Sequence, residues 1–487
     1  MIGVTSALNS TYTLVKRELH VGDTAHFIIQ AKDAEGRNRV TGGDFWFPVL
    51  TSDVGAYPVK GGRTAGRVVD HNNGTYSVFF YVGWEGIAYV HMRLASPSEA
   101  TKWLREKYWP TEKRVFWVGN FTTNDTAEFE TSVCFMLRNV TSRDLCMIDH
   151  NEKATGLTAF YCKKPQTFNC DEFDTSSVAY KLTDRRTRQL IQGKIELFVG
   201  NNCWKQLTNG PEYINITSVG NRSTPDATQL NLTGNGQAPA VCKPDDKPLV
   251  NYGFWLNDEW HHLQCNVRRW DDAKAVRSCL RNKHVFINGD SNVRLWYCKL
   301  LTKLGFPFRG RGCLHMKSAH SYFQDYDLEM TYYFHPHVIM RTKFTLPEAL
   351  YEVDLLDNIP SDSCDKFIIV FCPWGHFTQW TTESFVERTQ LLKEAVVRFR
   401  ARCPDVPIII KGVHARDYVT TLMGVYANDY TIWNLGRILK EIFNGTGVFY
   451  YEGWQMNLAY GEPSMHMPTL VINQEINWFL SYVCNRK

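Results

Sequence analysis

The sequence predicts a protein of several domains: an all-β module, a cysteine-rich segment and an α/β domain, in that order. At 487 residues the chain is long enough for roughly two to four domains. Apolar and polar side chains alternate with a period of two up to about residue 97. The pattern then loosens between 98 and 248, and buried strands alternate with amphipathic helices from 249 onward. We therefore expect domains at residues 1–97, 98–248 and 249–487.

The first module has the pattern of half-buried strands. Residues 25–31, 76–82 and 88–94 each alternate apolar and polar side chains, and the turn signal Asn72-Asn73-Gly74 precedes the second run. Turns containing Asp and Gly separate these runs at intervals typical of a sandwich. This pattern predicts an immunoglobulin-like or filamin-like β-sandwich. Such modules usually bind or act as spacers, and no catalytic constellation is visible in this one.

Cysteines and glycosylation signals indicate an oxidising compartment. The chain has 14 cysteines, which permit up to seven disulfides, and the segment from 98 to 248 reads as a small core stabilised by such bonds. Nine Asn-x-Ser/Thr sequons start at Asn9, Asn73, Asn120, Asn124, Asn139, Asn215, Asn221, Asn231 and Asn444. We therefore expect a glycoprotein that is secreted or resides in the lumen of the secretory pathway. The start at Met1 lacks a signal-peptide pattern, so the sequence reads as a mature fragment whose targeting segment is missing.

Composition excludes several function classes. The formal net charge is only +4 and no long basic block occurs, which argues against nucleic-acid binding and polybasic membrane binding. No apolar run approaches the roughly 20 residues that a membrane-spanning helix needs. Neither a Cys-x-x-Cys pair nor a Cys/His cluster at zinc spacing stands out, so we expect no bound metal and no resident cofactor.

The last domain reads as a largely parallel sheet with helices on both faces. A helix with Phe385, Leu392 and Phe399 on one face lies between the second and third predicted strands, and Thr382 is its predicted N-cap. The predicted strands are His284–Asn288, Phe367–Phe371, Val406–Ile410 and Val448–Tyr451.

A Gly-Asp-Ser triplet, Gly289-Asp290-Ser291, follows the first of these strands. A serine at such a turn lies at the C-terminal edge of the sheet, where open α/β sheets bind their ligands. His466 lies in a loop just before a final helical pattern that contains Ile472 and Ile476. A nucleophile early in the domain and a histidine before the last helix is the chain order of the SGNH (GDSL-type) esterases.

Motifs along nearly the whole chain resemble the neurexophilin and PC-esterase domain family. They are Gln30–Asp33, Gly42–Phe45, Asp70–Tyr76, Pro97–Ala100, Phe160–Pro165, Trp255 with Trp260, Cys279–Lys283, the Gly-Asp-Ser triplet, Arg294, Trp296 and the run from Trp454 to Cys484. The resemblance implies a three-layer, SGNH-like α/β domain that acts on acyl groups of glycans, with O-acetylation of sialic acid as one attributed activity. Neurexophilins are secreted ligands of cell-surface proteins, so the resemblance also implies a binding role.

Two residues are expected to carry the chemistry. Ser291 is the candidate nucleophile and His466 the candidate general base, against the alternatives of a helix-capping serine and a structural histidine. Related esterases have an aspartate three residues before the histidine, and this chain has Pro463 there. Glu452 and Glu462 are the candidate replacements for that acid. Loss of catalysis is equally consistent with the change.

Three further residues are candidates for binding the oxyanion or the substrate. Gly375 and His376 follow the second predicted strand, where the family reads Gly-Gln-His, and could donate hydrogen bonds to an oxyanion. Their alternative is a turn packed on the core. Arg294, one helical turn after Ser291, could bind a carboxylate or phosphate, or form a buried ion pair.

The sequence thus predicts a glycan O-acyltransferase or esterase, with an acyl-CoA-type donor implied if the protein is a transferase. Its partners would be a glycan or glycoprotein, with sialic acid as one candidate, and cell-surface or extracellular proteins. The alternative is a catalytically inactive secreted glycoprotein with an extracellular binding or structural role. A third reading is a lectin that uses an aromatic-rich cleft.

Overall fold

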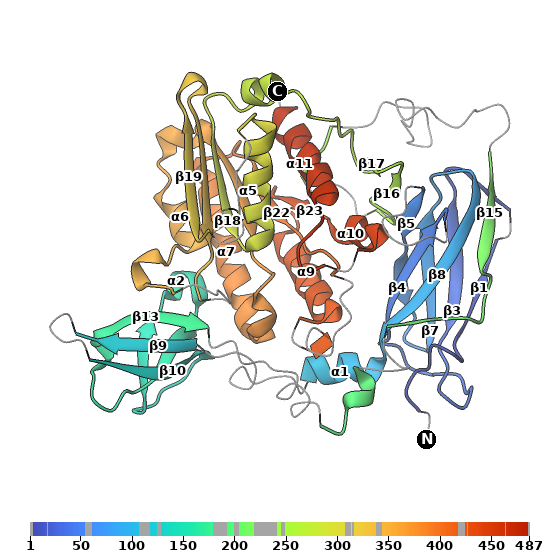
Figure 1. Ribbon diagram of the computed structural model, residues 1–487, viewed down its shortest axis with the longest axis horizontal. Coiled ribbons are helices and arrows are strands. Elements are labelled where there is room, and N and C mark those ends of the chain that lie inside the picture. The colour runs from blue at the N-terminus through green and yellow to red at the C-terminus, as the bar shows by residue number, and fades with distance from the viewer. Residues whose placement is uncertain are drawn as a thin grey trace.

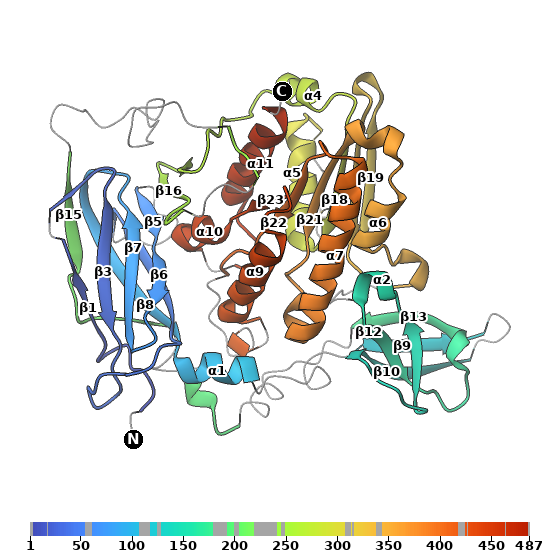
Figure 2. The same ribbon diagram turned by 180° about the vertical axis from the view of Figure 1, so that it is seen from behind.

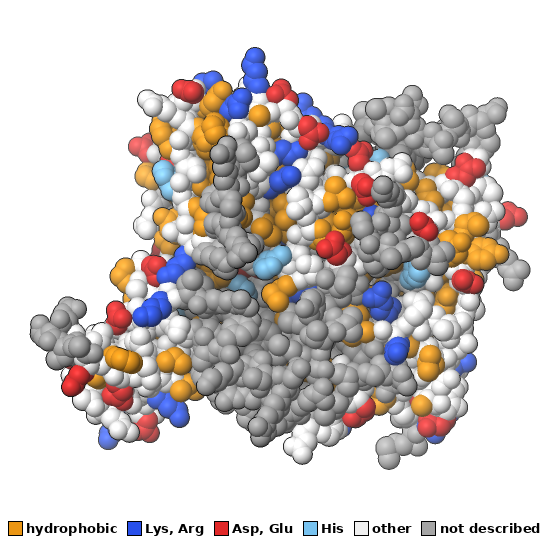
Figure 3. Space-filling view, in the orientation of Figure 1, with side chains coloured by type: hydrophobic (Ala, Val, Ile, Leu, Met, Phe, Trp, Pro, Cys, Tyr) orange, Lys and Arg blue, Asp and Glu red, His pale blue; other side chains and the backbone are white. Residues whose placement is uncertain are grey.

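A computed structural model describes residues 3–16, 18–53, 61–106, 117–123, 128–178, 192–198, 204–218, 241–244, 249–306, 313, 316–337, 343–416, 424–425, 427–462 and 464–485. The chain forms a β-sandwich, a smaller β-sheet and an α/β layered region, and the two β units lie on either side of the α/β region (Figures 1 and 2). On the face shown in Figure 3, acidic and basic side chains are interspersed, as the small net charge of +4 leads one to expect.

The sandwich consists of two sheets that enclose a core of side chains such as Phe27, Val78 and Phe80. The four-stranded sheet has the order β1 (Thr11–Leu14), β3 (Thr24–Gln30), β7 (Thr75–Tyr81) and β6 (Arg67–Asp70). The eight-stranded sheet has the order β17 (Glu259–His262), β16 (Gly253–Leu256), β5 (Arg63–Ala65), β4 (Phe45–Thr51), β8 (Gly86–Ser96), β15 (Tyr213–Thr217) and β2 (Leu19–His20), with β14 (Lys205–Gln206) also paired to β8.

The larger sheet crosses the boundaries at 97 and 248 that the sequence indicated. Strands β14 and β15 come from the segment expected to be cysteine-rich, and β16 and β17 come from the segment expected to be α/β. Each of these four strands is only two to five residues long, which is too short to show a clear alternation.

The middle unit is a five-stranded antiparallel sheet that follows α1 (Ser98–Glu106). Two disulfides, Cys134–Cys162 and Cys146–Cys170, link its neighbouring segments. Its core is continuous with that of the α/β region, to which the short helix α2 (Glu152–Thr155) also connects it. The strand order is β11 (Leu145–Asp149), β12 (Thr158–Lys163), β10 (Phe129–Arg138), β9 (Trp117–Thr122) and β13 (Phe173–Val178).

The α/β region is built on a six-stranded sheet that is parallel except at its edge strand β19. The order is β19 (Ser318–Phe323), β20 (Leu328–Phe334), β18 (His284–Gly289), β21 (Phe367–Cys372), β22 (Ile408–Lys411) and β23 (Phe449–Tyr451). Helices α5 and α11 cover one face and α6 and α7 the other (Figures 1 and 2). The helices are α4 (Ala273–Cys279), α5 (Ser291–Lys303), α6 (Glu352–Asn358), α7 (Thr382–Arg402), α9 (Asp429–Phe443), α10 (Trp454–Tyr460) and α11 (Thr469–Cys484). The side chain that caps α7 belongs to Thr381, which accepts from the Ser384 N–H, and not to Thr382 as expected.

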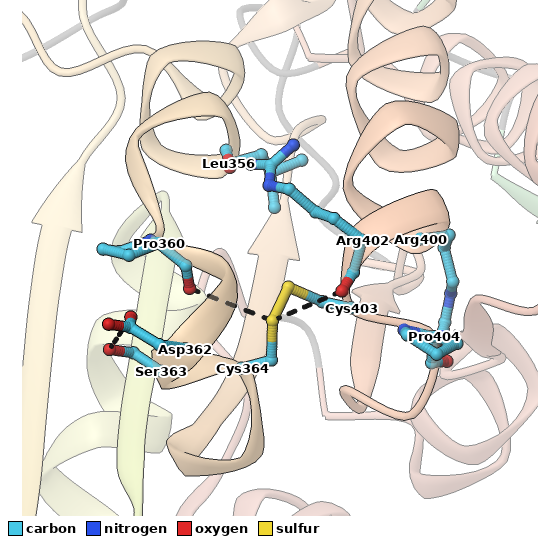
Figure 4. The surroundings of a disulfide bond; sticks show 9 residues. All are labelled: Leu356, Pro360, Asp362, Ser363, Cys364, Arg400, Arg402, Cys403 and Pro404. Carbon is cyan, nitrogen blue, oxygen red and sulfur yellow. Dashed lines mark hydrogen bonds between the residues drawn. A yellow bond between two sulfur atoms is a disulfide. The ribbon is translucent and has the colours of Figure 1, made fainter.

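Disulfides also hold the α/β region together. Figure 4 shows Cys364 of the 3₁₀ turn η8 (Ser361–Lys366) bonded to Cys403, directly after α7, while Arg402 donates to the Leu356 carbonyl oxygen. The others in this half of the chain are Cys242–Cys265, Cys279–Cys484 and Cys298–Cys313. Cys372 is buried without a disulfide, and Cys203 lies outside the described residues. Within the described part of the chain, no helix is long and apolar enough to span a bilayer.

Candidate active site

Ser291 occupies the first turn of α5, directly after β18. The side chain of the buried Asp290 caps this helix by accepting from the Asn292 N–H at 2.8 Å. Gly289 ends the strand with φ 153°, and a Cβ there would lie 2.7 Å from the Cβ of Cys372. The local sequence therefore produces a tight strand-to-helix turn that holds the serine at the C-terminal edge of the sheet.

His466 meets this serine from the other end of the domain. Its Nε2 lies 2.8 Å from the Ser291 Oγ, although the two residues are 175 positions apart. The pKa of His466 is lowered, mainly because burial disfavours the charged ring. The Asp290 carboxylate acts in the opposite direction, and the cations of Arg294 and Arg416 add to the lowering. A neutral imidazole with a free lone pair on Nε2 can accept the serine proton.

The loop that carries His466 rests on the segment that follows β22. The Ser464 N–H donates to the Arg416 carbonyl oxygen at 3.0 Å. The ring of the fully buried His414 lies against the backbone of Met465, and Lys411 Nζ is 3.8 Å from the Sδ of Met467. The position of the histidine is thus set by contacts on both sides of it.

No carboxylate orients the imidazole in the described part of the chain. Glu452 instead accepts from Lys440 Nζ at 3.4 Å and from the Trp454 N–H at 3.2 Å. Glu462 is exposed, and neither glutamate lies within 4 Å of a His466 ring nitrogen. Pro463 lies outside the described residues. The expectation that Glu452 or Glu462 replaces the acid of a triad has no support in the geometry.

Gly375 lies directly against the turn that carries Ser291. A Cβ at this position would be 1.8 Å from Asp290 Oδ2, so only glycine fits. Among the residues that the structure describes, the backbone N–H groups of Ser291 and Gly375 donate to no protein acceptor. Burial lowers the pKa of the neighbouring His376 to about 4, so its ring is neutral near pH 7. Two backbone donors and one neutral ring are therefore available near the serine.

Arg294 is buried one turn after Ser291, with 7% of its surface exposed. No Asp or Glu in the described ranges forms an ion pair with it, and its Nε has no hydrogen-bond partner. The ion pair that was its structural alternative is therefore not observed. A guanidinium buried in this way is stabilised by a bound anion.

Further histidines reach the same edge of the sheet and were missed by sequence reasoning. His335 follows β20 and His414 follows β22, and both side chains are fully buried with pKa values well below the ordinary one because of burial. Their position after buried strands was a usable signal, because the carboxyl ends of parallel strands meet at one edge. No group of three or more His, Cys, Asp or Glu side chains in the described ranges could hold a metal ion.

Two family models match the chain. One, described as "NXPE family member 4-like, C-terminal domain", matches residues 260–484 and therefore covers both Ser291 and His466. The other, described as "Neurexophilin", matches residues 40–189, which span part of the sandwich and the middle sheet.

Proposed function

Because the chain belongs to the neurexophilin and PC-esterase domain family, we propose that it is an acyl-ester transferase or esterase that acts on glycans. Acetyl is the acyl group that the family resemblance favours, and the secretory pathway is the proposed location. The observation that supports this proposal most directly is the 2.8 Å contact between the Ser291 Oγ and the His466 Nε2.

The proposed reaction begins with Ser291 donating its hydroxyl proton to His466 Nε2 as its Oγ bonds to the acyl carbonyl carbon. The tetrahedral oxyanion then collapses and the bond to the leaving atom breaks; this atom is the oxygen of an ester or the sulfur of an acyl-CoA-type donor. His466 returns the proton to that atom. An acyl-serine remains. Water or a sugar hydroxyl attacks the acyl carbon in the second half, gives its proton to His466, and releases Ser291, which regains the proton. Water yields hydrolysis, and a sugar hydroxyl yields transfer.

The same site contains groups suited to the charges of this reaction. The N–H groups of Ser291 and Gly375 would donate to the oxyanion, and the helix dipole of α5 has the sign that stabilises it. The neutral ring of His376 would serve as a further donor. Arg294 would bind a carboxylate or phosphate of the substrate or donor, because its buried guanidinium has no carboxylate partner in the described ranges.

We also propose the specific folds of the first and last domains. The parallel sheet with helices on both faces and the serine after β18 support an SGNH-like α/β domain. The two facing sheets at the N-terminus support an immunoglobulin-like or filamin-like sandwich. We keep the predicted three-part division of the chain, with β14–β17 added to the sandwich.

The disulfides and sequons support the proposal that the protein is secreted and glycosylated. Six disulfides are stable in oxidising compartments, and neurexophilins are a secreted family. The sequon asparagines Asn73, Asn139, Asn215 and Asn444 are exposed, as glycan attachment requires. Asn124, Asn221 and Asn231 lie outside the described residues.

A serine-reactive fluorophosphonate tests the catalytic proposal. We expect the probe to label the wild-type protein at one peptide that contains Ser291. Ser291→Ala should abolish the adduct and His466→Ala should slow its formation by about 10²-fold or more, because the base is lost. Ser142→Ala, which changes an exposed loop serine, is the matched control and should label normally. Adduct formation that survives both active-site substitutions would overturn the assignment.

The second candidate is an inactive secreted glycoprotein with an extracellular binding role. The missing orienting carboxylate and the match of the neurexophilin model to residues 40–189 favour it. The same experiment separates the two candidates. A wild-type protein with a native circular dichroism spectrum and no adduct at Ser291 would favour the binding role.

A further inference from the structure

A second cavity lies between the sandwich and the α/β region, and the proposed reaction does not use it. Its volume is about 640 Å³, within the range of about 300–1,000 Å³ typical of small-molecule sites. Strands β4 and β6, helices α1, α9 and α10 and the end of β23 contribute to its lining. Glu452, which the sequence had associated with the catalytic centre, lines this cavity together with Gln455.

Aromatic rings form one wall of the cavity. The ring of Phe45 lies 5.6 Å from Tyr430, 5.8 Å from Trp433 and 6.1 Å from Trp454, measured between centroids. Trp433 on α9 is 39% exposed, which is unusual for a tryptophan that serves packing alone. The wall therefore offers an accessible aromatic face to a ligand.

Polar groups converge opposite the aromatic wall. Lys440 Nζ donates to the Tyr252 hydroxyl oxygen at 2.5 Å and to Glu452 Oε2 at 3.4 Å. The Lys440 ammonium stays partly hydrated, because 37% of this side chain is exposed. An ammonium, a phenol and a carboxylate in one group can donate to and accept from several hydroxyl groups at once.

The rim of the cavity is mainly basic. Arg67, Arg105 and Arg437 line it, and all three are exposed. Asp70 also lines the cavity, and its carboxylate accepts from the Gly43 N–H at 2.7 Å. Arg105 lies 3.6 Å from Glu106 and Arg437 lies 3.3 Å from Glu441, whereas Arg67 forms no ion pair among the described residues. Arg67 is therefore the rim cation that is available to an anion, and the two paired arginines remain exposed beside it.

We propose that this cavity binds an acidic saccharide. The C–H face of a pyranose ring packs on an aromatic face, because the π-electrons attract the weakly positive hydrogens. The Lys440, Tyr252 and Glu452 group would bind the sugar hydroxyls, and the available arginine of the rim would pair with a carboxylate of the saccharide. Such a ligand uses the aromatic wall, the polar group and the basic rim together.

The cavity and the catalytic site are neighbours but separate. Val413 lines the cavity, whereas the next residue, His414, supports the loop that carries His466. The segment after β22 therefore divides the two. Saccharide binding here does not depend on acyl transfer at Ser291, and each can fail without the other.

The test measures binding of two defined tetrasaccharides to the full chain by isothermal titration calorimetry and tryptophan fluorescence. The probes are a hyaluronan tetrasaccharide, which carries carboxylates, and chitotetraose, which is neutral. We expect saturable binding of the hyaluronan probe that weakens with added salt, and weaker binding of chitotetraose. Trp433→Ala should weaken binding of the hyaluronan probe about tenfold or more.

Two further variants make the result specific. Tyr322→Ala removes an aromatic side chain of 55% exposure from β19, at the far edge of the sheet, and should bind like wild type. Ser291→Ala should also bind like wild type, because the cavity does not include that residue. Absence of saturable hyaluronan binding, or equal losses in Trp433→Ala and Tyr322→Ala, overturns the saccharide site. Equal affinity for chitotetraose overturns its acidic specificity.

Discussion

A buried ion pair beneath the loop that carries His466 provides a sharp test of the packing. Lys411 at the end of β22 and Glu475 on α11 are both fully buried, with Lys411 Nζ 3.4 Å from Glu475 Oε1. The other oxygen, Oε2, accepts from Trp296 Nε1 at 2.6 Å. Burial raises the pKa of Glu475, and Lys411 and Trp296 act against this rise. The perturbation of interest is Lys411→Met, which keeps the length of the side chain and removes its charge.

Removal of one partner from a buried pair costs about 3–5 kcal/mol, because the remaining charge is left without compensation. We therefore expect Lys411→Met to lower the free energy of unfolding by this amount near pH 7. The cost should shrink as the pH falls, because the raised folded-state pKa of Glu475 means that protonation relieves it. The double variant Lys411→Met/Glu475→Gln should recover most of the loss, since the glutamine can still accept from Trp296.

Urea unfolding followed by tryptophan fluorescence and near-ultraviolet circular dichroism measures these free energies. The fluorophosphonate labelling rate provides a second readout, because Lys411 also contacts Met467 beside the histidine. A loss below about 1 kcal/mol for Lys411→Met would refute the reasoning. So would a double variant that is no more stable than the single one.

Two more predictions concern the pH dependence of fluorophosphonate labelling and the disulfide between Cys279 and Cys484. Fluorophosphonate labelling should rise with pH through a midpoint below about 6.5, because the base must be neutral and the pKa of His466 is lowered. Arg294→Met should move this midpoint upward, since the guanidinium helps to lower that pKa; an unchanged or lower midpoint would contradict the argument. Cys279→Ser should lower the free energy of unfolding by up to about 5 kcal/mol, because the bond to Cys484 closes a loop with a separation of 205 residues. An unchanged urea midpoint would show that this loop is already restricted in the unfolded chain.

Local patterns were sufficient to predict that Ser291 and His466, the two central residues of the candidate site, lie together. Ser291 follows a buried apolar strand and begins a helix, so both its exposure and its edge position depend on a few neighbouring residues. His466 precedes a helix with a clear apolar face, and that helix packs beside α5. Because both signals are local and both elements border the same sheet, their meeting could be expected before the structure was known.

Other features depend on contacts that no local pattern reveals. Glu452 was a plausible partner of His466 by sequence distance, but it follows the edge strand β23 and pairs with Lys440 of α9. The strands β14–β17 join the sandwich from distant parts of the chain, each with too few residues to show a period. The Lys411–Glu475 pair was invisible for a further reason, because charged residues are normally assigned to the surface.

The surroundings of His466 explain how the site could function without an orienting carboxylate. A carboxylate beside the imidazole would raise its pKa and stabilise its cation, whereas here burial and the cations of Arg294 and Arg416 lower the pKa. An anionic substrate bound to Arg294 would neutralise one of these cations at the moment of binding. His466 would then become a stronger base only when substrate is present, so substrate charge would supply part of what the aspartate supplies in related esterases. A neutral substrate of equal size would bind without this gain and would acylate Ser291 more slowly.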